Sequence, residues 1–318
     1  MGVVPGAQRT AAGTHPEGRT RLTEIAVTEG PAFPSLPPGR DIEIAGSGTI
    51  HLHDFGGPPG APAIALLHGW TATADVNWYT CYARLADSYR VFAYDHRGHG
   101  RGLRSKRPFR LEDCADDVVA VADALAIDTF IPVGYSMGGA VAQLVWHRHR
   151  ERVAGLVLCA TASYFAELRA ERLSFLGLSG LAALARVTPA QAREWLTQQF
   201  YLQRKSLTWE PWAVQQAASH DWRMMLEAGS AIGSFTSRAW IGEVDVPTSI
   251  LVTMRDGVVP LRRQVELFES IPGAEAFRVD GEHDAVVTRA DRFVPTLLRA
   301  LDSVTSRILR GPVATALR

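Results

Sequence analysis

The sequence predicts an α/β fold in which a mostly parallel sheet carries helices on both faces. Two observations support this prediction. From residue 63 onwards, short continuous apolar runs alternate with segments of helical periodicity, and the connections between them are short. Strands buried on both faces of a parallel sheet are expected to be apolar throughout. The alternation stops between residues 163 and 246, which predicts an inserted helical layer, interpreted as a lid.

A lead-in and a hairpin are expected before the alternation begins. Residues 1–40 contain Gly, Pro, Thr and Arg without periodicity and predict a flexible N-terminal segment. Residues 41–45 and 49–55 alternate polar and apolar side chains on either side of a Gly-Ser-Gly turn. This pattern is typical of an antiparallel β-hairpin.

The predicted α/β core covers residues 41–162 and 247–306, on both sides of the insertion 163–246. Its strands are expected at 63–67, 90–94, 130–133, 153–159, 248–254 and 274–279. Its helices are expected at 77–87, 111–126, 137–150, 261–270 and 289–306. Residues 307–318 are predicted to be a C-terminal tail, and no internal repeat is found.

Composition excludes several classes of protein. Lys and Arg together number 33, as do Asp and Glu, so the net charge of zero argues against a nucleic-acid binder and against attraction to anionic membranes. Three cysteines without metal spacing favour a reducing compartment. The chain has no apolar stretch of about 18 residues and no signal-peptide pattern at its start. These features predict a cytoplasmic protein without stable membrane insertion, and they leave the oligomeric state open.

The strongest chemical signal is Gly134-Tyr135-Ser136-Met137-Gly138, between a predicted strand and a predicted helix. G-x-S-x-G in this position is typical of a nucleophile elbow, where a tight turn lifts the serine hydroxyl above the sheet. The glycines two residues before and after Ser136 are expected because side chains there would collide with neighbouring backbone. The start of the helix presents the Met137 N–H to a developing oxyanion.

Two further residues complete a predicted catalytic triad. Asp256 follows the strand 248–254, and His283 follows the strand 274–279. Both therefore lie at the carboxyl ends of strands, the edge at which open α/β sheets bind ligands. The chain order Ser, Asp, His predicts Ser136 as nucleophile, His283 as proton relay and Asp256 as the group that orients the histidine. Asp245 precedes its strand and lies at the wrong end of the sheet.

These segments resemble the α/β-hydrolase superfamily, in its lidded esterase and lipase-like form. The matching segments run from LLHGW (66–70) and AYDHRGHGRG (93–102) through PVGYSMGGAVAQ (132–143) to VTMRDGVVP (252–260) and DGEHDAVV (280–287). The resemblance implies that the turn after residue 94 is structural, shaped by Asp95, Arg97, Gly98 and Gly100. It also implies that a serine nucleophile excludes the family's dehalogenases and epoxide hydrolases, which use Asp at that position.

The remaining site residues are expected around the elbow. The turn His68-Gly69-Trp70 predicts the Trp70 N–H as the second oxyanion donor, with His68 as a buried brace of the loop. Candidate side chains for an apolar substrate pocket are Trp70, Tyr135, Trp195, Trp209 and Trp212. The histidines of the 95–100 turn, His96 and His99, are expected to be solvated. The acids of residues 112–117 are expected to form a solvated helix start and not a metal site.

The sequence therefore predicts a serine hydrolase that cleaves a hydrophobic carboxylic ester or monoacylglycerol-like lipid through an acyl-serine intermediate. No metal or organic cofactor and no partner beyond the small-molecule substrate are expected. A carbon–carbon bond hydrolase, a thioesterase and an acyltransferase share the same triad and stay as alternatives. An inactive ligand- or partner-binding module is the alternative from another class.

Overall fold

The computed structural model describes residues 34–187 and 211–310, and within them eight strands form one sheet in the order β1-β2-β4-β3-β5-β6-β7-β8. The first two pair antiparallel, as do β2 and β4, and the others run parallel. The strands are β1 Gly39–Ile44, β2 Gly48–Phe55, β3 Ala63–Leu67, β4 Arg90–Tyr94, β5 Ile131–Tyr135, β6 Leu156–Cys159, β7 Thr248–Thr253 and β8 Glu275–Val279. The predicted α/β fold with an N-terminal hairpin is confirmed.

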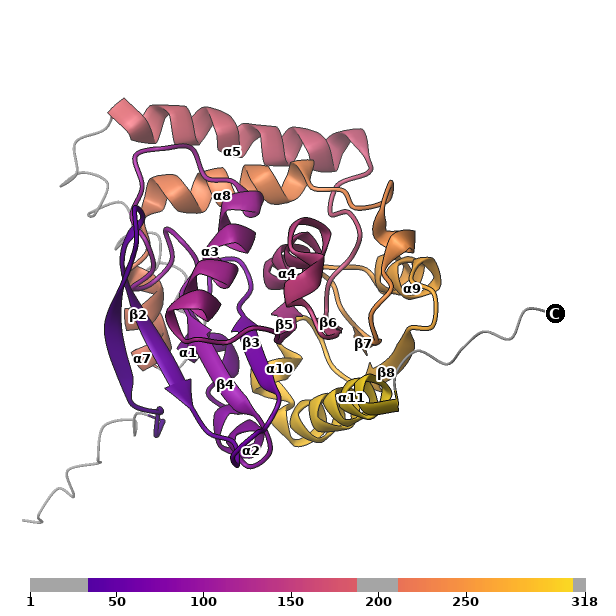
Figure 1. The fold of residues 1–318 in the computed structure, drawn as a ribbon. Coiled ribbons are helices and arrows are strands. Elements are labelled where there is room, and N and C mark those ends of the chain that lie inside the picture. Colours follow the sequence, from indigo (N-terminus) through magenta and orange to yellow (C-terminus); the bar gives the residue numbers. More distant parts are fainter. Residues whose placement is uncertain (1–33, 188–210, 311–318) are drawn as a thin grey trace, which may run out of the picture. The chain divides into compact units, whose positions relative to one another are not determined.

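Helices cover both faces of this sheet, and each face has its own hydrophobic core (Figure 1). On one face lie α3 Leu111–Ala124, α4 Met137–Arg148 and α9 Leu261–Ser270. The opposite face carries α1 Ala74–Trp78, α2 Tyr82–Ala86, α10 Ala285–Thr288 and α11 Ala290–Arg310. Two described 3₁₀ turns lie in loops that lead into strands. Arg150–Arg152 lies between α4 and β6, and Ile241–Glu243 lies just before β7.

The last helix shows why the periodicity of the sequence predicts its packing. In α11 the buried apolar side chains Phe293, Leu297, Leu301 and Val304 recur every three or four residues and face the sheet. Fully burying one such side chain contributes about 1.5–3 kcal/mol. This burial fixes the position of α11 beside β7 and β8, the two strands that lead into the loops of Asp256 and His283.

Among the described residues, three inserted helices follow β6 in the chain and precede β7: α5 Arg169–Val187, α7 Pro211–Ala218 and α8 Trp222–Ser234. Helices α5 and α8 run side by side (Figure 1). They approach so closely that a Cβ added at Gly233 would lie 2.3 Å from the side chain of Phe175. None of the described helices is long and apolar enough to cross a membrane.

Three local predictions differ from the structure. The last helix, expected to end at 306, continues to Arg310 and takes in the first residues of the predicted C-terminal tail 307–318. The single helix expected at 77–87 is two short helices, because Thr73 caps the first through a hydrogen bond from the Val76 N–H and the chain turns before α2. The strand expected at 153–159 begins only at Leu156, and Val153 makes an isolated bridge to Phe130. Cys81, Cys114 and Cys159 are free and buried.

Candidate active site

Ser136 lies on the turn between β5 and α4 in a strained backbone conformation. Its φ of 53° and ψ of −116° are unusual for a residue with a side chain. Hydrogen bonds hold the turn from two sides: the Ser136 N–H donates to the Cys159 carbonyl at 2.9 Å, and the Thr161 hydroxyl donates to the Ser136 carbonyl at 2.8 Å. The strained conformation is therefore maintained by Cys159, the last residue of β6, and by Thr161, two residues further along the chain.

The two glycines of the turn are required by close backbone contacts. A Cβ added at Gly134 would lie 2.2 Å from the carbonyl oxygen of Gly138. A Cβ added at Gly138 would lie 2.1 Å from the carbonyl oxygen of Leu67 at the end of β3. Both distances are far below van der Waals contact, so neither position accepts a side chain without moving the backbone.

Ser136, His283 and Asp256 form a continuous hydrogen-bonded chain. His283 Nε2 lies 3.0 Å from Ser136 Oγ, and His283 Nδ1 lies 2.8 Å from Asp256 Oδ2. The three residues follow β5, β8 and β7, so parallel strands bring their carboxyl ends to one edge of the sheet. In the neutral histidine, Nδ1–H donates to the carboxylate and Nε2 accepts the hydroxyl proton of Ser136.

Asp256 is held as a carboxylate by four further donors. Its Oδ1 accepts the N–H groups of Val258 and Val259 at 2.8 Å, and its Oδ2 accepts the Thr253 hydroxyl at 2.7 Å and the Gln264 amide at 3.3 Å. Burial alone would raise the pKa of Asp256. The hydrogen bonds and the neighbouring histidine instead hold this pKa below its usual value.

Thr253 and Gln264 were not identified from the sequence. Thr253 is a polar residue at the end of an apolar strand, which is the one signal that could have indicated it. Gln264 is fully buried on α9 and reaches Asp256 because that helix packs against β7. Its role could not be predicted from local pattern, since nothing near Gln264 in the sequence indicates which loop it contacts.

The turn that follows β3 lies directly beside Ser136. A Cβ added at Gly69 would lie 3.4 Å from Ser136 Cβ. Both polar groups of Gly69 are engaged: its N–H donates to Asn77 Oδ1 at 3.0 Å, and its carbonyl accepts His68 Nδ1–H at 2.8 Å. Among the described residues, the N–H groups of Trp70 and Met137 have no protein acceptor. The N–H groups of Trp70 and Met137 are therefore available as hydrogen-bond donors near the hydroxyl of Ser136.

Four buried histidines pack behind this turn. The expectation that His68 is a buried brace is confirmed, since its Nε2 also accepts the His96 N–H at 2.9 Å. The expectation that His96 and His99 are solvated is wrong, because the loop folds inward and both rings are buried against His68. His220, which precedes α8, packs 5.3 Å from His99. Burial lowers the pKa of all four, that of His220 to about 4.

The structural turn of residues 95–101 is held by buried charges. Asp95 accepts the N–H groups of Ala74 at 2.7 Å and Arg101 at 2.7 Å. Arg97 forms a bidentate pair with Asp117 at 2.7 Å. Asp117 is thus buried and paired, which corrects the expectation that all acids of 112–117 are solvated. Within the ranges that the structure describes, no cluster of three metal-ligating side chains is found.

The structure places the predicted pocket residues in different parts of the fold. Trp70 is half-buried and contacts α8. Tyr135 is buried in the core against Trp78 and Phe293, and its hydroxyl donates to the His283 carbonyl at 2.6 Å. This placement gives Tyr135 a role in holding the His283 loop and does not support one in lining a pocket. Trp212 packs edge-on against Tyr79 at 5.1 Å. Trp195 and Trp209 lie outside the described residues.

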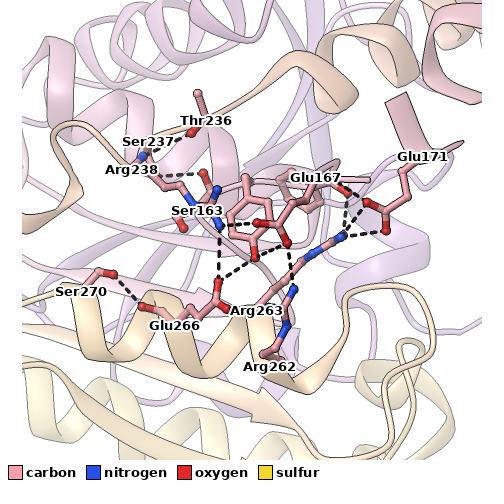
Figure 2. Close-up of polar contacts among 12 residues, drawn as sticks. Ser163, Glu167, Glu171, Thr236, Ser237, Arg238, Arg262, Arg263, Glu266 and Ser270 are labelled. Atoms are coloured by element: carbon pink, nitrogen blue, oxygen red, sulfur yellow. Dashed lines mark hydrogen bonds and ion pairs between the residues drawn. The ribbon is translucent and has the colours of Figure 1, made fainter. Parts of the chain in front are cut away.

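Ion pairs fix the start of the inserted segment to the helix that follows the Asp256 loop (Figure 2). Glu167 pairs with Arg238 at 3.1 Å and with Arg262 of α9 at 2.8 Å. Glu171 pairs with the buried Arg263 of α9 at 2.7 Å. Burial opposes ionisation of Glu171, but backbone N–H groups and Arg263 lower its pKa to about 2. The start of the insertion is thereby tied to the helix beside the loop of Asp256.

The comparisons with known proteins agree with this geometry. Residues 62–290 match the family model described as alpha/beta hydrolase fold. A putative carbamate hydrolase RutD from Agrobacterium fabrum is 28% identical over 76% of this chain and 93% of its own length. The crystal structure of the enol-lactonase from Burkholderia xenovorans LB400 superposes with a TM-score of 0.66 at 25% identity, over 83% of this chain and all of that one. An esterase from Exiguobacterium antarcticum shares the fold at 19% identity, with a TM-score of 0.69 over 83% of this chain and all of its own.

Proposed function

Since the chain belongs to the alpha/beta hydrolase fold family, we propose that it is a serine hydrolase that cleaves hydrophobic carboxylic esters through an acyl-Ser136 intermediate. One observation carries the proposal: the hydrogen-bonded chain from Ser136 through His283 to Asp256, with the serine on a strained turn. A serine hydroxyl becomes a useful nucleophile when an adjacent base accepts its proton and a third group orients that base.

The proposed reaction has two acyl-transfer steps. Ser136 Oγ attacks the ester carbonyl carbon while its proton moves to His283 Nε2, and the carbonyl oxygen becomes an oxyanion that accepts the N–H groups of Met137 and Trp70. The tetrahedral intermediate collapses, and the leaving alkoxide takes the proton from His283. Water then attacks the acyl-serine by the same route, with His283 as base, and releases the carboxylic acid.

The surroundings of Trp70 support an uncharged, apolar acyl group. Leu178 of α5 and Gly229 of α8 lie against the same space as the indole ring, and Met225 is buried beside it. Such a surface favours hydrocarbon and disfavours charge. The relatives named for a carbamate hydrolase and an enol-lactonase support attack at a carbonyl carbon that carries an oxygen or nitrogen leaving group. In this proposal, the core of 41–162 and 247–306 carries the chemistry, and the insertion 163–246 covers it.

Hydrolysis of p-nitrophenyl esters from acetate to palmitate tests the proposal. We expect turnover to rise with chain length beyond acetate, and Ser136→Ala to lower kcat by about 10⁴-fold or more. Ser234→Ala, which removes an exposed hydroxyl on α8, is the matched control and is expected to keep wild-type turnover. Faster cleavage of acetate than of every longer ester would contradict the apolar acyl group.

Labelling with a fluorophosphonate separates the alternatives. Rapid labelling of the wild type but not of Ser136→Ala, without turnover of any ester, would favour a carbon–carbon hydrolase or an acyltransferase. Neither labelling nor turnover would favour an inactive binding module.

A further inference from the structure

The inserted helix α8 contacts the turn that carries the Trp70 N–H, through a hydrogen bond and close packing. We propose that α8 is a working part of the oxyanion hole: the indole of Trp70 and the side chain of His220 are positioning groups that hold the Trp70 N–H in place. This inference rests on the proposed function and extends it. Its consequence is that a displacement of α8 weakens transition-state binding even where the substrate still binds.

The first connection runs from the Trp70 side chain to α8. The indole Nε1–H donates to the Met225 carbonyl at 2.9 Å. The ring also lies against Gly229 of α8, where a side chain does not fit: a Cβ added at Gly229 would lie 2.6 Å from the Trp70 ring and 2.5 Å from Leu178. A hydrogen bond and a close packing contact thus fix the side chain of the residue whose N–H is the proposed donor.

The second connection acts on the next residue of the turn. His220 Nε2 lies 3.2 Å from the Thr71 carbonyl, and His220 Nδ1 accepts the Gly100 N–H at 2.8 Å. Since Nδ1 accepts, Nε2 carries the proton and donates to Thr71. Thr71 has a φ of 61°, a left-handed conformation that a β-branched residue adopts only when its surroundings hold it there. His220 is one of the contacts that hold it.

The start of α8 is itself anchored, so it can act as a fixed support. Asp221, the N-cap of α8, donates its N–H to the Gly98 carbonyl at 2.8 Å, and its side chain accepts the Met224 N–H at 3.1 Å. Gly69, on the other side of Trp70, is held by Asn77 and His68. The Trp70 peptide is therefore held on one side by α1 and the residue after β3, and on the other by α8 and the residues that precede it.

The inference predicts a lower kcat when the contacts between α8 and the Trp70 turn are lost. A donor displaced by about 1 Å no longer meets the oxyanion, and misplacements of this size cost up to about 100-fold in rate. The oxyanion forms only on the way to the tetrahedral intermediate, so kcat is expected to fall by a larger factor than KM changes. The defect should also weaken a tetrahedral adduct of Ser136, because that adduct carries the same oxyanion.

The first test removes the indole donor. Trp70→Phe keeps an aromatic ring but loses the hydrogen bond to the Met225 carbonyl. We expect kcat on the ester that the wild type cleaves best to fall 10- to 100-fold. The inhibition constant of an alkyl trifluoromethyl ketone, which forms a tetrahedral adduct, should rise by the same factor. Trp240→Phe, far along the chain and packed on Trp146, is the matched control and should change neither.

The second test separates the two nitrogens of His220. His220→Asn places an acceptor near the position of Nδ1 but has no donor at that of Nε2, so it should lower kcat about tenfold. His220→Gln can place an amide N–H near the position of Nε2 and should restore most of that loss. A purely structural role would not distinguish the two variants in this direction, since Asn keeps the bond to Gly100.

The third test moves α8 without deleting a polar group. Gly229→Ala places a methyl against the Trp70 ring, whereas Gly177→Ala on α5 places the same methyl where no atom lies within 4 Å. We expect Gly229→Ala to reproduce the fall in kcat and the rise in inhibition constant, and Gly177→Ala to keep wild-type values. Burst titration of Ser136 counts the active molecules, so that kcat is compared per competent site.

Two outcomes are decisive. If the wild type is active and Trp70→Phe, His220→Asn and Gly229→Ala all keep its kcat and inhibition constant, α8 does not position the donor and the inference fails. The same conclusion follows if kcat falls without a matching rise in the inhibition constant. A wild type that neither cleaves esters nor is labelled at Ser136 contradicts the proposed function instead.

Discussion

Two histidine–aspartate pairs in this molecule have nearly the same geometry but different surroundings. His283 Nδ1 lies 2.8 Å from Asp256, and His53 Nε2 lies 3.0 Å from Asp75. The first pair stands at the carboxyl edge of the sheet, with 21% of the His283 side chain exposed. The second joins β2 to α1, with 5% of the His53 side chain exposed. Only the first has a hydroxyl at its other nitrogen.

The atom at the other ring nitrogen decides what each pair can do. His53 faces acceptors on both sides, Asp75 and the Pro38 carbonyl at 3.3 Å, so both nitrogens must carry protons to satisfy them. Burial alone would lower the pKa of His53, but the hydrogen bond and charge of Asp75 raise it. His283 faces one acceptor and one hydroxyl, which suits a neutral ring with a free lone pair. The cationic His53 forms a structural ion pair with Asp75. The neutral His283 can accept a proton from the Ser136 hydroxyl.

The largest expected difference between the pairs is in turnover. Asp256→Asn should lower kcat by about 10⁴-fold, because an amide no longer enforces the tautomer of His283 that accepts the serine proton. Asp75→Asn should leave kcat within a few-fold of wild type. Steady-state kinetics on one ester measures both. An equal loss of kcat in the two variants would show that the different surroundings of the two pairs do not explain activity.

The free energy of unfolding should depend more on the His53–Asp75 pair than on the His283–Asp256 pair. His53→Leu removes one partner of the buried Asp75, which keeps Arg101 and the Tyr82 hydroxyl, and should lower the free energy of unfolding by about 1.5–3 kcal/mol. His283→Leu should change it by less than about 1 kcal/mol while it abolishes turnover, since the His283 side chain is partly exposed and Asp256 keeps its four other donors. Urea denaturation followed by circular dichroism measures these differences. A His283→Leu variant as unstable as His53→Leu would remove the distinction.

Acidification should weaken the fold through His220. Its pKa of about 4 lies below the value of about 6.5 expected in the unfolded chain, so its contribution is present above pH 6.5 and is lost as pH falls towards 4. This group alone should cost about 2 kcal/mol between pH 7.5 and 5. His220→Gln should reduce that dependence by about this amount in urea titrations at the two pH values, while His68, His96 and His99 keep their own contributions.

His53 should act in the opposite direction. Its pKa is raised, so the His53–Asp75 pair contributes fully below pH 6.5 and loses its contribution as pH rises through the pKa of the folded protein. His53→Gln is therefore the control: it should change the alkaline side of the stability profile and leave the acidic side steep. A flattened acidic side in His53→Gln would contradict the assignment to His220.

The smallest effects are expected at the tyrosines that contact each pair. Tyr135 donates to the His283 carbonyl at 2.6 Å, and Tyr82 donates to Asp75 Oδ1 at 3.3 Å. Each Tyr→Phe change should cost about 1 kcal/mol of stability. Tyr135→Phe should also lower kcat a few-fold through the loop of His283, whereas Tyr82→Phe should leave kcat unchanged. Thermal unfolding and initial rates measured on the same samples would compare the two.

The parts of the site that local pattern predicts are those encoded by a short stretch of chain. Ser136 could be found because the elbow needs a strand, two glycines and a helix within a few residues, and His283 and Asp256 because each follows an apolar strand. The structure brings these three side chains within hydrogen-bond distance. His96 and His99 were misjudged, because the direction in which a polar loop folds does not follow from its polarity.

By itself, the sequence determined the order of strands and helices, the turn that carries Ser136 and the loops that carry its two predicted partners, since apolar periodicity and glycine spacing are local properties. Tertiary structure alone decided that Gln264 supports Asp256, that Tyr135 holds the His283 loop, and that His220 of the insertion contacts Thr71. The physical reason is distance along the chain. These contacts join residues 8 to 149 positions apart, and only the packing of the sheet and its helices brings them together.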